Sequence, residues 1–442
     1  MSSVLFRDAV IVTMDRERRI IKGNLLIEDD RIKEVNAVDD HADRVVDCCG
    51  RVLIPGLIQT HIHLVQALFR GQADDLSLLD WLRKKIWPLE AAHDADSIYY
   101  SAMLGIAELL RGGTTSIVDM ATVNHTETLF EAIIESGIRA MSGKCMMDIG
   151  DDTPAGLSES TENSLTKSIQ LLEKWHGRAN NRLQYAFNPR FVLSCSEELL
   201  IQVRELASRY KVMIHSHASE NRDEIALVEE ILGRRNILYF DDIGLTGNNL
   251  ILAHCIWVND EELDILRRSG TVVAHCPSSN LKLGSGIAPI VQMSEMGINL
   301  SLGADGAPCN NNLDPFLEMR TAALIQKPIH GPTALPAEKV FEMATLGGAK
   351  AMNMSGEIGS IEQGMKADLV LLEMNRPHNM PSKGKSIYGR LVYETKSTDV
   401  YMTMVDGNIL YYDDRLQTLD ERNILKQSDK ALARILERVG ER

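Results

Sequence analysis

Eight apolar segments alternate with amphipathic helical stretches through the middle of the chain, and this alternation constrains the fold more than any other feature. The apolar segments are residues 53–60, 115–119, 138–146, 183–188, 211–215, 250–253, 271–274 and 299–303. Helical stretches between them include residues 94–111, 162–175 and 196–210. Strands that alternate with helices form parallel sheets, and eight such units are the number that closes a barrel. The sequence therefore predicts an α/β fold with a TIM-like (β/α)8 barrel over residues 55–358.

The two ends of the chain differ from the middle, because both consist of short strand-like segments separated by turns. These segments are residues 9–13, 24–28, 31–35 and 44–47 near one end, and 367–373, 400–405 and 408–412 near the other. We expect residues 1–54 and 359–420 to pair as one composite β-sandwich domain. Residues 421–442 are predicted to form a C-terminal surface helix, to which we assign no function. A chain of 442 residues can hold this domain beside a barrel of ~250 residues.

Composition and charge argue against several classes of function. The formal net charge is −15 and no run is rich in lysine or arginine, so nucleic acid is not an expected partner. No apolar run approaches the ~20 residues of a membrane span, and the first eight residues lack the order of a signal peptide, so we expect a cytoplasmic protein. Seven scattered cysteines without a Cys-x-x-Cys pair indicate buried free thiols rather than disulfides or a thiolate zinc site.

Two histidines end the first predicted barrel strand, in residues 55–64, Pro-Gly-Leu-Ile-Gln-Thr-His-Ile-His-Leu. Alternate residues of a strand face the same way, so His61 and His63 project to one side, roughly 6–7 Å apart along the backbone. That spacing suits two ligands of one metal ion, and imidazole suits zinc, iron or nickel. An isolated His-x-His pair is a weak signal, and further polar residues at strand ends strengthen it.

More histidines stand at the ends of later predicted strands. His217 is the candidate third imidazole, and Glu220, three residues on, could lean over the metal as a proton carrier. His215 lies deeper in its strand, and we favour a structural, hydrogen-bonded role for it. His254 closes the next strand and is expected to be functional, although a lone histidine there is often structural. For His275 two roles stay open, support of the metal site from behind the ligands and simple packing.

Asp305 follows the last apolar run, in Leu-Gly-Ala-Asp-Gly-Ala, and is the candidate fourth ligand. A carboxylate in such a place costs free energy unless it is paired or bound to metal, and the alternative is a helix N-cap. The flanking Gly303 and Gly306 are expected to let the backbone turn tightly. Three imidazoles and a carboxylate leave a coordination position for water, whose pKa then falls towards ~7.

This ligand set predicts metal-assisted hydrolysis. His254 would accept or orient the proton of the water, Glu220 would protonate the leaving nitrogen, and Asp305 counts as a catalytic residue as well as a ligand. One divalent ion per subunit is expected. Zn²⁺ is our first expectation, and Fe²⁺ and Mn²⁺ also suit these ligands.

Taken in order along the chain, these motifs resemble the amidohydrolase superfamily. The match covers residues 55–63, 217–220, 253–255, 275–286 and 303–306. The resemblance implies that His61, His63, His217 and Asp305 bind one metal and that Glu220 and His254 handle protons. Residues 214–217 are Ile-His-Ser-His, without the lysine of members that bridge two metals, which implies a mononuclear site.

Within that superfamily the chain is similar to deaminases of methylthioadenosine, S-adenosylhomocysteine or 5′-deoxyadenosine. Residues 69–71, 80–82, 87–90, 280–289 and 307–312 carry this similarity. It implies that Trp81 walls the substrate pocket and that Glu90 holds the ribose hydroxyls, a role open to a carboxylate because it accepts from adjacent donors. The alternative is that Trp81 only packs and Glu90 is a solvated helix end.

Two positions depart from that branch. Arg190 stands where the branch has a histidine against the purine, and residues 188–196 and 219–224 look instead like guanine deaminase, whose matching arginine contacts the base. Lys144 and Gly156 occupy the positions of two arginines that grip the homocysteine carboxylate. Lysine is a point charge rather than a fork, so a small 5′ group is favoured over S-adenosylhomocysteine.

The predicted function is hydrolytic deamination of a 5′-modified adenosine, giving the inosine analogue and ammonia. One alternative is a deaminase or hydrolase of a free aminated heterocycle, either a guanine-like purine or an s-triazine. Another is a non-catalytic, metal-stabilised barrel, which predicts that a ligand or proton carrier is missing, and none is. The resemblance also implies a homo-oligomer.

Overall fold

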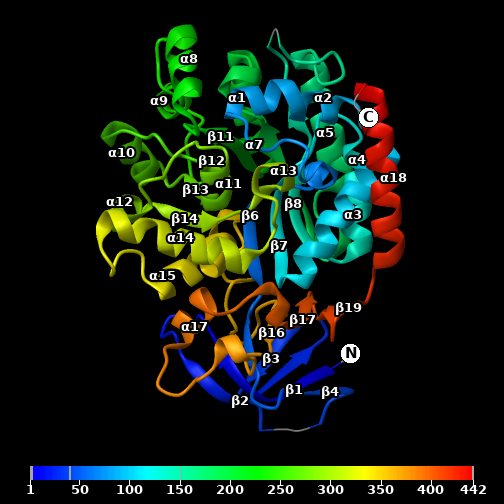
Figure 1. The fold of residues 1–442 in the computed structure, drawn as a ribbon, viewed down its shortest axis with the longest axis vertical. Coiled ribbons are helices and arrows are strands. Elements are labelled where there is room, and N and C mark those ends of the chain that lie inside the picture. The colour runs from blue at the N-terminus through cyan, green and yellow to red at the C-terminus, as the bar shows by residue number, and fades with distance from the viewer. Residues whose placement is uncertain (1–2, 39–40, 151, 441–442) are drawn as a thin grey trace.

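Two sheets organise the molecule, as the computed structural model shows for residues 3–38, 41–150 and 152–440. The larger sheet curls into the barrel, with helices around it, and the smaller sheet lies beneath one end (Figure 1). Blue strands from near the N-terminus and orange strands from the later part of the chain lie together in the smaller sheet, as predicted for the composite domain (Figure 1). The predicted domain limits include residues 1–2 and 39–40, which lie outside the described part of the chain, and the limits themselves stay a prediction.

Eight parallel strands form the barrel. They are β6 (Leu57–His63), β7 (Thr114–Met120), β8 (Arg139–Gly143), β10 (Leu183–Pro189), β11 (Met213–Ala218), β12 (Leu250–His254), β13 (Val272–His275) and β14 (Asn299–Leu302). Most of their residues are buried, as expected for parallel strands that are covered on both faces. The short β15 (Asp305–Gly306) continues β14 and pairs with β6, so the last strand returns to the first. The predicted barrel is confirmed.

The predicted strand over residues 53–60 is in fact two strands that belong to different sheets. β5 (Val52–Pro55) pairs with the strands of the chain ends, and β6 begins two residues later. Gly56 lies between them and packs so closely that an added Cβ would lie 2.1 Å from Thr115 Oγ1. The apolar run is continuous because both strands are buried, so hydrophobicity alone gives no sign of the break.

Helices connect the barrel strands and cover the outside of the barrel. The longer ones are α3 (Ala95–Arg111), α4 (Thr126–Ser136), α5 (Thr161–Trp175), α7 (Glu197–Tyr210), α8 (Arg222–Leu232), α9 (Asn236–Asp242), α10 (Asp260–Ser269) and α14 (Pro315–His330). Local sequence sets their ends: Asp94 and Ser97 form a capping box on α3, and left-handed Gly233 ends α8. Short helices α1 (Leu78–Trp81), α2 (Trp87–Ala91), α11 (Pro277–Lys282) and α13 (Ala307–Asn310) lie between them.

The smaller sheet contains nine strands from both chain ends, in the order β19-β18-β17-β16-β5-β1-β2-β3, with β4 beside β1. These strands are β1 (Ser3–Val12), β2 (Ile20–Glu28), β3 (Arg31–Val35), β4 (Arg44–Asp47), β5, β16 (Leu369–Leu372), β17 (Val400–Val405), β18 (Asn408–Tyr412) and β19 (Arg415–Leu416). β5 and β16 pair antiparallel where the two chain ends meet, and the sheet has a hydrophobic core of its own.

A buried ion cluster joins the two sheets. Arg139 of β8 contacts Asp368 just before β16 through Nε and Nη2, at 2.7 and 3.0 Å, and its Nη2 lies 3.2 Å from Asp406 after β17. The side chains of Arg139 and Asp368 are 1% and 2% exposed. A charge this deep needs partners, so the cluster fixes the barrel against the smaller sheet.

The predicted C-terminal helix is α18 (Glu421–Val439), which packs on α3 (Figure 1). Residues 441–442 of the predicted helix lie outside the described residues. No helix in the described part of the chain is long and apolar enough to span a bilayer. All seven cysteines are described and unpaired; six are buried as predicted, whereas Cys49 is exposed.

Candidate active site

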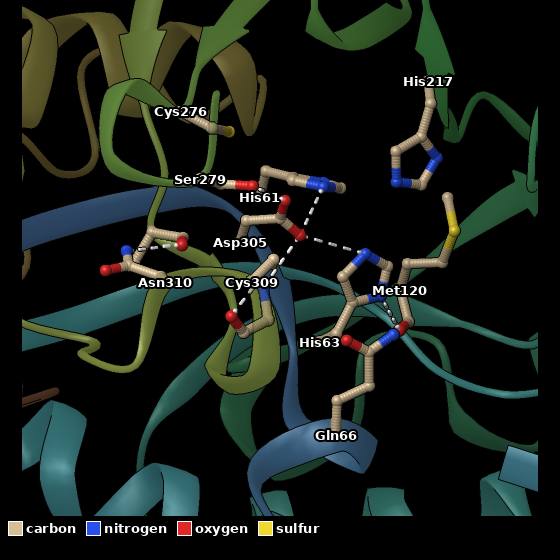
Figure 2. Close-up of polar contacts among 12 residues, drawn as sticks. His61, His63, Gln66, Met120, His217, Cys276, Ser279, Asp305, Cys309 and Asn310 are labelled. Atoms are coloured by element: carbon tan, nitrogen blue, oxygen red, sulfur yellow. Dashed lines mark hydrogen bonds and ion pairs between the residues drawn. The ribbon is translucent and has the colours of Figure 1, made fainter. Parts of the chain in front are cut away.

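The carboxyl ends of the barrel strands bring the sequence-predicted ligands together. His61 and His63 end β6, His217 lies in β11, and Asp305 begins β15; Figure 2 shows the three histidines and the aspartate facing one another. His61 Nε2 lies 3.2 Å, and His63 Nε2 3.4 Å, from the same oxygen of Asp305. Ligand atoms of His61, His63 and His217 all lie within 4.8 Å of one another, as do those of His61, His254 and Asp305.

Each imidazole is held by its other nitrogen. His63 Nδ1 donates to Met120 O at 3.0 Å, and His217 Nδ1 donates to Arg190 O at 2.7 Å. His61 Nδ1 is hydrogen-bonded to His215 Nε2 at 2.8 Å, so His215 is the buried, hydrogen-bonded residue that the sequence predicts. Backbone and side-chain partners of this kind orient histidines that bind metal through Nε2.

The donor set fits a divalent metal ion. His61 Nε2 is buried and has no hydrogen-bond partner among the described residues, which is costly unless a ligand takes it. Burial lowers the pKa of His63 to about 4 and that of His217 well below its usual value, so both are neutral, as metal ligands must be. Burial opposes ionisation of Asp305, but His61 and the other nearby histidines outweigh burial and hold its pKa well below its usual value.

Asp305 is positioned by its own backbone conformation and by two hydrogen bonds. Its φ of +65° is a left-handed value that costs free energy in a residue with a side chain. Ser279 Oγ donates to Oδ2 at 2.7 Å, and Gly306 N donates to Oδ1 at 2.7 Å. The expectation that Gly303 and Gly306 provide the tight turn is wrong. Asp305 adopts the left-handed conformation, and the glycines permit close approach: an added Cβ on Gly303 would lie 2.7 Å from His61 O.

Glu220 and His254 face each other beside this cluster. His254 Nε2 lies 3.5 Å from Glu220 Oε2 and 3.8 Å from Asp305 Oδ2. His254 Nδ1 donates to Asn280 Oδ1 at 2.8 Å, so the proton stays on Nδ1 and Nε2 is free to accept one. Burial, then the charges of Asp305 and Glu224, raise the pKa of Glu220 well above its usual value. Glu220 and His254 can therefore take up and release a proton at the same place beside the candidate ligands.

A cavity opens onto these groups. It is lined by His63, Gln66, Leu78, Trp81, Leu82, Arg190, Phe191, His217, Glu220, Glu224, His254, Leu283 and Asp305. Apolar side chains, Trp81 among them, form part of its wall, and its volume is about 30 Å³. An apolar wall facing a few polar groups is typical of a small-molecule site.

Arg190 and Gln66 line this cavity, and Glu90, behind the lining, joins them in a buried network. Arg190 Nη1 and Nη2 lie 2.7 and 3.3 Å from the two oxygens of Glu90. Gln66 Nε2 donates to Glu90 Oε1 at 2.8 Å. Glu90 is therefore not a solvated helix end, because its side chain is 1% exposed and both oxygens are engaged.

Three other sequence-predicted positions lie apart from the cavity lining. Lys144 is buried, forms an ion pair with Glu159 and donates to Cys145 O at 3.0 Å. Gly156 packs against Ala91 and cannot carry charge. His275 is buried, and neither ring nitrogen has a hydrogen-bond partner among the described residues, so its role in supporting the site stays a prediction.

Sequence reasoning missed several groups that position the site. Glu224 accepts hydrogen bonds from the backbone of Glu220 at 2.8 Å and from Asn236 Nδ2 at 2.6 Å. Asp119 accepts from Leu64 N at 2.8 Å, and burial raises its pKa to about 6. The signal available for Asp119 is a carboxylate at the end of a buried strand, the same signal that identified Asp305. For Asn280 and Gln66 no pattern in the sequence indicates the partner.

Comparison with known proteins agrees with this geometry. The model of the amidohydrolase family matches residues 52–410. A protein of Methanosarcina mazei named 5′-deoxyadenosine deaminase is 39% identical over 100% of both chains. One of Moorella thermoacetica, named 5-methylthioadenosine/S-adenosylhomocysteine deaminase, is 36% identical over 98% of this chain and 99% of its own. The crystal structure of an adenosine deaminase from Xanthomonas campestris with bound zinc has a TM-score of 0.92, at 29% identity over 98% of each chain.

Proposed function

The chain belongs to the amidohydrolase family, and on this premise we propose that it deaminates a 5′-modified adenosine. The products would be the inosine analogue and ammonia, and 5′-deoxyadenosine and 5′-methylthioadenosine are the first candidate substrates. The observation that carries the proposal is the convergence of four ligand side chains and the Glu220–His254 pair on one small cavity. Similarity to relatives named for these activities, over the whole chain, supports it.

One divalent ion, Zn²⁺, would be held in each subunit by His61, His63, His217 and Asp305. When bound, such an ion lowers the pKa of water and so supplies hydroxide at neutral pH. The buried, unpartnered Nε2 of His61 supports this assignment. The zinc-bound relative from Xanthomonas campestris supports the choice of metal.

Proton transfer would be divided between two residues. His254 Nε2 accepts a proton from the attacking water as its oxygen bonds to C6 of the purine. Glu220 gives its proton to the adjacent ring nitrogen, then takes the proton of the hydroxyl now on C6 and passes it to the amino group. The bond from C6 to the amino nitrogen breaks, the C6 oxygen becomes a carbonyl and ammonia leaves, and the proton held by His254 returns to Glu220. The raised pKa of Glu220 supports this role, because a carboxyl group whose pKa is raised keeps its proton to a higher pH and can act as an acid.

The remaining walls of the cavity would bind the purine and the sugar. Trp81 would stack on the base and Arg190 would donate to the base. Glu90, which is bonded to Arg190 behind the cavity lining, would accept from a ribose hydroxyl. We also propose a homo-oligomer in the cytoplasm.

The 5′ end of the substrate would be small and uncharged. Lys144 is paired with Glu159, and Gly156 cannot carry charge, so neither residue is available to hold a carboxylate. This favours a deoxy or methylthio group over homocysteine.

A substrate screen read by ammonia release tests the proposal. It should include purine nucleosides, free aminopurines and aminotriazines, with a parallel ultraviolet assay of the change from adenine to hypoxanthine. We expect 5′-deoxyadenosine or methylthioadenosine to be turned over fastest. Conversion of a guanine-like base or a triazine, with no conversion of any adenosine, would replace the proposal with the free-heterocycle alternative.

A further inference from the structure

Gln66 carries a buried polar atom that the site described so far leaves unused. It lies in the 3₁₀ helix Leu64–Phe69, three residues after His63, and its side chain lines the cavity. Gln66 is 0% exposed, and its Oε1 has no hydrogen-bond partner among the described residues. A buried amide oxygen without a donor costs free energy, and at a ligand cavity a ligand can supply that donor.

Glu90 fixes which end of the amide faces which way. The nitrogen, Nε2, lies 2.8 Å from Glu90 Oε1, and a carboxylate beside a guanidinium accepts hydrogen bonds but does not donate them. The reversed amide would place two acceptors against each other. The amide oxygen must therefore point away from Glu90, and it lies close to Gly306, where an added Cβ would be 2.2 Å from it. This places Gln66 Oε1 beside the backbone of the metal ligand Asp305.

Glu90 provides a second acceptor, bonded to the same amide: its Oε1 accepts from Gln66 Nε2 and its Oε2 from Arg190 Nη1. A carboxylate has about four lone-pair sites. Three are taken, by Arg190 Nη1 at 2.7 Å, Arg190 Nη2 at 3.3 Å and Gln66 Nε2 at 2.8 Å. The fourth site is on Oε2. Gln66 and Arg190 line the cavity and Glu90 is bonded to both behind that lining, so a neutral amide and a carboxylate that Arg190 holds in place each offer one acceptor. Two neighbouring acceptors match a ligand with two neighbouring donors.

We propose that Gln66 Oε1 accepts a hydrogen bond from one ribose hydroxyl of the substrate, beside the hydroxyl that Glu90 accepts. This inference rests on the proposed function, because it requires a nucleoside rather than a free base. The vicinal hydroxyls of ribose are two donors on adjacent carbons, which is the pattern that the paired acceptors require. Gln66 is thus a specificity-determining residue that selects ribonucleosides over deoxynucleosides, and it takes no part in proton transfer.

The test pairs a side-chain change with a matching change in the substrate. Gln66→Met keeps the length of the side chain and removes the acceptor. The substrates are 5′-deoxyadenosine, 2′,5′-dideoxyadenosine and 3′,5′-dideoxyadenosine. The wild-type protein should prefer the ribonucleoside to one of the dideoxy compounds by about tenfold or more in kcat/KM through this contact, and Gln66→Met should lose that preference. The loss should reside mainly in KM, because the bond forms in the ground state as well.

Gln326→Met is the matched control. Gln326 on α14 is also 0% exposed, donates to Ala288 O at 3.1 Å and has an unpartnered carbonyl oxygen, but it does not line the cavity. The Gln326→Met variant should keep the wild-type preference for the ribonucleoside over the dideoxy compound. For a Gln66 variant with weak turnover, calorimetric binding of 5′-deoxyinosine against its 2′- and 3′-deoxy analogues gives the same comparison.

Two results would overturn the inference, and only the second would also overturn the proposed function. If the wild-type protein deaminates nucleosides and Gln66→Met keeps the full preference for the ribonucleoside, Gln66 is not a ribose acceptor, and the proposed function stands. If the wild-type protein deaminates only free bases, both fail.

Discussion

Replacement of Glu220 by glutamine separates proton transfer from metal binding. Glu220 is 5% exposed, and its Oε2 lies 3.5 Å from His254 Nε2. Glutamine has nearly the same shape but cannot give up a proton at neutral pH. A positioned acid–base group contributes about 10²–10⁴ in rate, which corresponds to about 3–5 kcal/mol in the barrier. We therefore expect kcat to fall by a factor in that range while KM changes little.

The bound metal should be unaffected, because Glu220 supplies none of the clustered ligand atoms. The assay is steady-state ammonia release, with metal content measured on the same preparation. Glu230→Gln on the exposed side of α8 is the control and should behave as wild type. Activity of Glu220→Gln within a few-fold of wild type, at equal metal content, would remove this residue from the mechanism.

Further predictions concern the metal, the response to pH and the joint between the two sheets. Asp305→Ala and His217→Ala should each lose bound metal and activity together, and full metal content in either variant would contradict the ligand assignment. Burial lowers the pKa of His93 to about 4, whereas the unfolded chain titrates near 6.5. Between these pH values the His93 imidazole binds a proton in the unfolded state but stays neutral in the folded state. The free energy of unfolding should therefore fall by up to about 3 kcal/mol as pH drops from ~6.5 to ~4. Urea titrations should show a smaller fall in the free energy of unfolding for His93→Gln than for the wild-type protein. Identical slopes of this free energy against pH in the two proteins would refute the assignment. Arg139→Met leaves the carboxylates of Asp368 and Asp406 buried without their guanidinium partner and should cost about 3–5 kcal/mol in urea unfolding. Adding Asp368→Asn and Asp406→Asn should restore part of that loss, and no restoration would show that the charges are not its cause.

The meeting of the candidate ligands at one place could be predicted because strand ends share an edge. His61 and His63 follow a continuous apolar run, and Asp305 follows another, 242 to 244 positions later. In a parallel barrel both ends meet at one rim, whatever the separation along the chain. This rule needs only hydrophobic patterning, which local sequence carries.

The partners of those residues could not be predicted in the same way. Asn280 holds His254, Met120 holds His63, and Gln66 holds Glu90. Each contact depends on the register between neighbouring elements, and several amides or carbonyls within a turn of one another would satisfy the same pattern. The left-handed conformation of Asp305 also escaped prediction, because glycines on both sides gave a simpler explanation of the turn.

The sequence by itself therefore determined the barrel, the union of the two chain ends in one sheet, and the candidate ligands that meet at one rim of the barrel. Burial and alternation are properties of neighbouring residues, so they can be read without knowing the fold. Only the tertiary structure decided that Glu90 is clamped by Arg190, that Lys144 is turned towards Glu159, and that Gln66 keeps a free acceptor on the cavity wall. These contacts change with shifts of a few tenths of an ångström in the distances between groups that are far apart along the chain, and such distances are set by the packing of the whole molecule.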